Sequence, residues 1–127
     1  MEAFKLEVSD ILGNLGNLSR EFADSKDFGI VKVDDSGIIQ LYNKYESELA
    51  GVPVANAEGK NFFTQVAICT NNRLFFGKFK DGVIKKQLDS TFYYVFTYKM
   101  KPTNVVIRLY RDPNNQSNWI FIKKRWV

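Results

Sequence analysis

The sequence predicts an α+β domain in which short helices and one longer connector helix pack on a central five-stranded antiparallel sheet. Two extended segments around a turn come first, a helical middle follows, and three strand-like segments fill the last third. The chain has 127 residues and is 45% hydrophobic, which suits one domain with its own core. We therefore expect a single domain over residues 1–127, with a helical cap in 1–26 and the core in 27–127.

The N-terminal cap is expected to contain only short helices. Its apolar residues, among them Phe4, Ile11 and Phe22, come in short steps interrupted by Gly13 and Gly16. Because glycine weakens a helix interior, this pattern predicts two short helical turns rather than one long helix.

A β-hairpin and a short helix are predicted next. Residues 28–33 and 38–42 are apolar and extended in pattern, and Asp34-Asp35-Ser36-Gly37 between them is typical of a turn. Asn43 is a good helix N-cap, so a helix should run from there to about Ala50.

The middle of the chain should be irregular and then helical. Pro53 predicts a break into partly helical structure that continues to Thr70. After Asn71-Asn72, the side chains of Phe75, Phe79 and Val83 fall on one helical face, which predicts the connector helix.

Three antiparallel strands are predicted over residues 92–100, 104–111 and 119–124. Alternate residues of the first of these strands share one face of the sheet. Such a stripe is usually core, but it also suits the wall of a pocket for a flat aromatic ligand. Its members are Phe92, Tyr94, Phe96, Tyr98 and Met100.

Composition excludes several function classes. The chain has one cysteine and no histidine, so it lacks an internal disulfide, a His-ligated metal site and a histidine-based triad. We expect neither a metal nor an enzyme. The basic clusters at Lys85-Lys86 and Lys123–Arg125 are interpreted as solvated surface rather than a nucleic-acid site. A charged N-terminus and the lack of a long apolar run predict a cytoplasmic protein without a membrane segment.

Three residues are candidates for chemistry. Cys69 follows an apolar segment and, taken alone, is most simply a buried small side chain. Glu46 has the spacing of a reciprocal capping partner of Asn43, which is the interpretation we favour from sequence alone. The rival interpretation is a buried, protonated carboxyl that serves as a proton source. Tyr42 is interpreted as a core tyrosine bonded to a backbone carbonyl.

Several motifs connect this chain to a known family. They are Tyr42-Asn43, Glu46, Gly59-Lys60-Asn61-Phe62-Phe63, Val66-Ala67, Cys69-Thr70, Gly77-Lys78-Phe79-Lys80, the alternating Phe96, Tyr98 and Met100, and Trp119. In these motifs the chain resembles the photoactive yellow proteins, small PAS-type sensor domains, over residues 28–123.

The resemblance implies a blue-light photoreceptor. Cys69 would carry 4-hydroxycinnamic (p-coumaric) acid as a thioester, with Tyr42 and a protonated Glu46 bonded to its phenolate. Light would isomerise the chromophore, Glu46 would give up its proton, and partial unfolding that releases the cap would signal to an unknown downstream protein. We expect a monomer. The other residues implied at the site are Ala50, Val52, Phe62, Val66, Ala67, Thr70, Phe96, Tyr98 and Met100, of which Met100 would assist the return to the dark state.

Three positions depart from the family pattern. Ala50 replaces a threonine that supports the tyrosine, Val52 replaces an arginine over the phenol end, and Ile68 replaces a proline. In the cap, where the family has a cation–π contact to the lysine matching Lys123, this chain offers Leu6, with Phe4 nearby. The alternatives are a PAS domain that senses a noncovalent aromatic ligand, a relative without a chromophore, and a thiol-dependent enzyme.

Overall fold

The computed structural model describes residues 2–97 and 101–125 and contains the predicted five-stranded antiparallel sheet. The strand order is β2-β1-β5-β4-β3, so the first and last strands lie side by side. The predicted residues Tyr98 and Met100 lie outside the described residues. The strands are β1 (Gly29–Val33), β2 (Ile39–Tyr42), β3 (Asp89–Phe96), β4 (Thr103–Arg111) and β5 (Asn118–Lys124).

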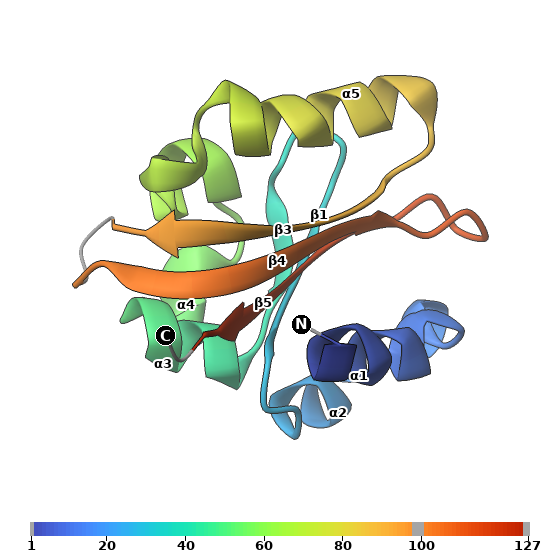
Figure 1. Cartoon of the computed structure of the whole chain (residues 1–127). Helices are drawn as coiled ribbons and strands as arrows, with labels where there is room; N and C mark the ends of the chain where they lie inside the picture. The colour runs from blue at the N-terminus through green and yellow to red at the C-terminus, as the bar shows by residue number, and fades with distance from the viewer. Residues whose placement is uncertain (1, 98–100, 126–127) are drawn as a thin grey trace.

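The helices divide between the two faces of the sheet. Figure 1 shows α5 on one side and α1 with α2 on the other. Between α4 and α5 the chain forms three short helical segments, of which 62–66 and 73–77 are π-helical and 68–70 is a 3-10 helix. The helices are α1 (Glu2–Leu12), α2 (Arg20–Asp24), α3 (Lys44–Ala50), α4 (Val54–Ala57) and α5 (Lys78–Lys85).

As predicted, the cap is not one long helix, because its helices are interrupted at Gly13, but the first of them is longer than expected: α1 has eleven residues. Its buried side chains are Phe4, Val8 and Ile11, which follow helical spacing along one face. This stripe packs on one face of the sheet against Phe28 and Phe121, and together these residues form the smaller of two apolar cores, called the second core below. Burial of the stripe stabilises three turns of helix.

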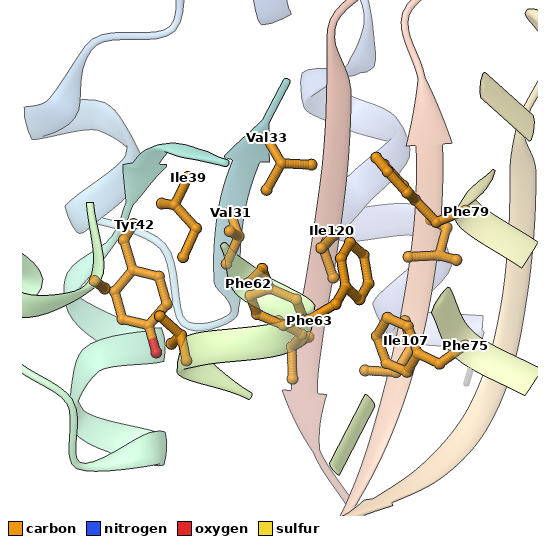
Figure 2. Packing of buried hydrophobic residues seen from close by; sticks show 14 of the residues in the cluster. Val31, Val33, Ile39, Tyr42, Phe62, Phe63, Phe75, Phe79, Ile107 and Ile120 are labelled. Carbon is orange, nitrogen blue, oxygen red and sulfur yellow. The ribbon is translucent and has the colours of Figure 1, made fainter. Parts of the chain in front are cut away.

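The main core lies between the sheet and the chain segment from α3 to α5. Figure 2 shows Phe62, Phe63, Phe75 and Phe79 facing aliphatic side chains of the strands. The predicted aromatic stripe belongs here, because Phe96 is buried in this core and Phe92 and Tyr94 pack against it. The strand residues labelled in Figure 2 are Val31, Val33, Ile39, Tyr42, Ile107 and Ile120.

Contacts at the far end of the cap differ from the sequence expectation. Phe4 meets the edge of the Phe28 ring, with centroids 6.3 Å apart. Lys123 forms ion pairs with Glu7 at 3.1 Å and with Asp27 at 3.2 Å. In the described residues, the cap is thus tied to β5 through the carboxylate of Glu7, and Phe4 of the cap packs in the second core on this face of the sheet.

One buried side chain, Asn43, connects the cap, the sheet and α3. Its Oδ1 accepts hydrogen bonds from the backbone N–H of Ile30 at 2.9 Å and of Glu46 at 3.2 Å. Its Nδ2 donates to the carbonyl oxygens of Ala23 at 2.9 Å and Phe28 at 3.0 Å. The N-cap of α3 is therefore also the tie between α2 and β1.

Among the described helices, none is long and apolar enough to span a membrane.

Candidate functional site

Two buried side chains at the end of β2 and the start of α3 have unpaired polar atoms. Tyr42 is 0% exposed and Glu46 is 1% exposed. Within the described part of the chain, the Tyr42 hydroxyl and Glu46 Oε1 are the buried side-chain polar atoms without a hydrogen-bond partner. Figure 2 shows the Tyr42 ring in the main core beside Ile39. An unpaired buried polar group costs about 1–3 kcal/mol, so this arrangement favours a binding partner.

The sequence-based interpretation of Glu46 as a reciprocal capping partner was wrong. Asn43 does cap α3, but its own backbone N–H donates to the Ile30 carbonyl at 3.1 Å and is not open to Glu46. The carboxyl of Glu46 instead turns inward and lies against the Cα atom of Gly29 in β1. Tyr42 also differs from expectation, because its hydroxyl has no backbone carbonyl partner.

Burial determines the protonation of both groups. Desolvation raises the pKa of the Glu46 carboxyl to about 8, so it holds its proton at neutral pH. Burial, and then the nearby Glu46, raise the pKa of the Tyr42 phenol. Both side chains are therefore hydrogen-bond donors near neutral pH, and Glu46 is the more acidic of the two.

Cys69 lies in the 3-10 turn Ile68–Thr70 and packs, partly buried, on the main core. The backbone carbonyl of Cys69 accepts from Asn72 Nδ2 at 3.1 Å and from the Tyr94 hydroxyl. On its other side, the Thr70 hydroxyl donates to the Ala67 carbonyl at 2.6 Å. These bonds fix the backbone around a free thiol.

The two hydrogen bonds to the Cys69 carbonyl come from Asn72 and Tyr94, which sequence reasoning did not assign to the site. Tyr94 belongs to the aromatic stripe, so its position on the core face was predictable, but its bond to a carbonyl was not. Asn72 was seen only as a residue before the connector helix. It accepts from the Phe75 N–H at 3.0 Å and so caps the turn that leads into α5.

Other predicted site residues surround the same core. Phe62, Val66 and Phe96 are buried in it, and Val52 and Ala67 pack against it, partly buried. A surface hollow of about 250 Å³ is lined in part by Val52 and Val66. Ala50 is the last residue of α3 and is partly exposed, and within the described residues it does not belong to this core.

The arrangement has defined chemical capabilities. Tyr42 and Glu46 can together bind an oxygen acceptor inside the protein, and Glu46 can release a proton to it. The thiol of Cys69 packs on the same core and offers a point of covalent attachment. Two buried donors suit an oxygen acceptor inside the core, because their hydrogen bonds would offset the cost of its burial.

Comparisons with known proteins identify similar chains and a similar fold. No family model matches the chain. A photoactive yellow protein from Rhodothalassium salexigens is 37% identical over 124 residues, which cover 98% of this chain and 99% of the relative. The photoactive yellow protein domain of the sensor histidine kinase Ppr from Rhodospirillum centenum is 39% identical with a TM-score of 0.84, covering 90% of this chain and 100% of that chain.

A more distant solved structure supports the fold alone. The PAS domain of a protein from Colwellia psychrerythraea is 17% identical with a TM-score of 0.66, covering 84% of this chain and 93% of that chain. With the match to the Ppr domain, this similarity confirms the predicted PAS-type fold.

Proposed function

This chain belongs to the photoactive yellow protein family, and from that premise we propose that it is a blue-light photoreceptor carrying 4-hydroxycinnamic (p-coumaric) acid as a thioester on Cys69. The observation that carries the proposal is the pair of unpaired atoms, Tyr42 Oη and Glu46 Oε1, inside the core. A phenolate oxygen would accept from both. Charge-assisted hydrogen bonds of this kind offset the cost of burying an anion.

The residues of the site divide into three roles. Cys69 would hold the chromophore covalently, and Tyr42 and Glu46 would hold its phenolate oxygen. Phe62, Val66, Ala67 and Phe96 supply apolar walls, because they lie in or on the same core as the thiol. Thr70 keeps the backbone beside Cys69 in place through its bond to Ala67. By resemblance, Tyr98 and Met100 complete the walls.

Glu46 would supply the proton of the light response. When bound, the chromophore would absorb blue light and isomerise about its double bond. Glu46 would then give up its carboxyl proton to the phenolate oxygen: its O–H bond breaks, an O–H bond forms on the phenol, and the negative charge stays on Glu46. A carboxylate at this 1% exposed position is desolvated and destabilises the folded site.

The cap is the segment through which this destabilisation would become a signal. Glu46 lies on α3, whose N-cap Asn43 donates to Ala23 of the cap. The next residue, Lys44, donates its backbone N–H to Asp24 Oδ1 at 2.8 Å. Opening around Glu46 would strain these bonds and favour release of residues 1–26 as a shift between two states. A downstream signalling protein would then recognise the released form of a cytoplasmic, monomeric receptor.

The first test is chromophore loading. Purified protein is incubated with an activated ester of 4-hydroxycinnamic acid, and intact mass and the visible spectrum are measured for the wild type and Cys69→Ala. We expect one adduct and a yellow colour that blue light bleaches reversibly, both lost in the variant. An adduct that survives the substitution contradicts the proposal. Colour without a covalent adduct would instead identify a domain that binds an aromatic ligand noncovalently.

Ala50→Thr tests the effect of a departure from the family pattern on colour. Alanine cannot donate to the Tyr42 oxygen, so Tyr42 would be a weaker donor to the phenolate and negative charge would spread along the chromophore. We therefore expect the loaded Ala50→Thr variant to absorb at shorter wavelength than the wild type. Equal or longer wavelength in absorption spectra at matched pH would exclude this explanation.

A further inference from the structure

Gly29 and Glu46 are in contact in a way that leaves no room for a side chain at position 29. A Cβ atom on Gly29 would overlap Glu46 Oε1 and would lie 3.3 Å from both Cβ and Cδ of Glu46. Non-bonded heavy atoms normally lie about 3.5 Å or more apart. The backbone of Gly29 is ordinary extended strand, paired with Ile122, so its conformation does not require glycine. The requirement is the space that Glu46 occupies.

We propose that Gly29 is a positioning residue, whose bare Cα forms the wall that holds the Glu46 carboxyl inside the core. Glycine loses more conformational freedom on folding than other residues and has no side chain to pack, so its presence at the start of β1 needs a compensating reason. The close approach of a carboxyl supplies one. The inference rests on the proposed function only where it assigns the light response to Glu46; the contact itself does not depend on the chromophore.

The helix that carries Glu46 cannot simply move away from β1. Asn43 joins the start of α3 to Ile30, the neighbour of Gly29, through the bonds Ile30 N–H to Asn43 Oδ1 and Asn43 N–H to the Ile30 carbonyl. The position of α3 relative to β1 is therefore fixed beside the contact. A methyl group at position 29 would displace the Glu46 side chain instead of the helix.

Displacement of the carboxyl would change how firmly it holds its proton. Desolvation is the cause of the raised pKa of Glu46, and Tyr42 is the titratable group with which it interacts. A side chain pushed out of its present position loses part of its burial. Gly29 thus controls the acidity of the group that the site uses as a donor.

The experiment uses chromophore-free protein, so that it is independent of loading. The titration of Glu46 is followed by the ¹³C resonance of carboxyl-labelled glutamate, assigned with Glu46→Gln. In Gly29→Ala we expect the midpoint to fall by about one pH unit or more. The control is Gly82→Ala in α5, a position far from Glu46 in the sequence. A Cβ atom on Gly82 would lie 2.7 Å from Cβ of Leu88, so this substitution also crowds the core but does so away from Glu46. The control should unfold at a lower temperature but leave the Glu46 midpoint unchanged.

A folded Gly29→Ala protein with an unchanged Glu46 midpoint overturns the inference. If Gly29→Ala does not fold, the same substitution in a Glu46→Ala background decides, because removal of the carboxyl opens the space that the methyl group needs. Recovery of folding there supports the inference, and continued unfolding overturns it. Failure of p-coumaric acid to attach to the wild type would reject the photoreceptor proposal and leave this result standing.

Discussion

Glu46→Gln is expected to remove most of the pH dependence of stability between pH 5 and 8 in the chromophore-free protein. The pKa of Glu46 rises from 4.5, the ordinary value, to about 8 on folding. Between these values the folded protein holds one proton more than the unfolded chain. The contribution of Glu46 to the free energy of unfolding is therefore fully present below pH 4.5 and is lost as pH rises to 8, by about 4 to 5 kcal/mol in total. Glutamine does not titrate, so its curve should be flat.

The window suits Glu46 because the chain has no histidine, the side chain that ordinarily titrates there. Asp27 and Asp35 have lowered pKa values, each chiefly through side-chain hydrogen bonds, so their contribution is lost at more acidic pH. Urea unfolding at pH 5, 6, 7 and 8 gives the slope. Glu48→Gln, an exposed position on the same helix, is the matched control and should retain the wild-type slope. A steep slope in Glu46→Gln would contradict burial of this carboxyl.

Asn43→Ala is expected to lower the free energy of unfolding by about 3 to 5 kcal/mol. The substitution removes four hydrogen bonds in a fully buried position, and it leaves the Ile30 N–H and the carbonyls of Ala23 and Phe28 without this partner. It also removes the N-cap of α3. Denaturant unfolding at pH 7 measures the loss.

Another helix N-cap, Ser19, provides a control that separates the loss of the buried hydrogen bonds of Asn43 from the loss of helix capping alone. Ser19 caps α2 by accepting from the Phe22 N–H at 3.1 Å, but it is exposed. Ser19→Ala should therefore cost only about 1 kcal/mol. Hydrogen exchange should also show faster exchange over α2 in Asn43→Ala, since the tie to Ala23 is lost. If the two alanine variants are equally destabilised, Asn43 acts only as a helix cap.

The strands were predictable because their signals are local. The apolar segments 28–33 and 38–42 and the turn at Asp34–Gly37 between them predict the first hairpin, and Asp34 Oδ1 accepts from the N–H groups of Ser36 and Ile38. The length of α1 was not predictable in this way. Gly13 comes just after the end of that helix, and what stabilises the helix is contact with strands distant in the sequence. Most of the stability of a helix this short comes from tertiary packing, which its own sequence does not reveal.

The site was only partly predictable for a similar reason. The spacing from Asn43 to Glu46 suits both a capping pair and a buried carboxyl, because both begin with the same first turn of a helix. Which of the two roles Glu46 takes depends on β1, a strand distant from Glu46 in the sequence. Gly29 of β1 leaves space for the carboxyl, and the carbonyl of Ile30 in β1 accepts from the Asn43 N–H that a capping glutamate would need. Cys69 likewise had no local sign of activation. Its assignment depended on resemblance to a family, and its bonds to Asn72 and Tyr94 required three-dimensional coordinates.

The pairing of β1 with β5 has a consequence for biosynthesis. β1 is made early, but one of its two neighbours in the sheet, β5, is made after the other four strands. Until then the edge of β1 that pairs with β5 is open, and α1 lacks Trp119 and Phe121, part of the cluster in which it packs. Long-range pairing of this kind is slow and favours protection by chaperones. If the proposed chromophore attaches at Cys69, its loading is expected to follow synthesis of β5, because the core against which Cys69 packs includes Ile120 and Ile122 of that strand.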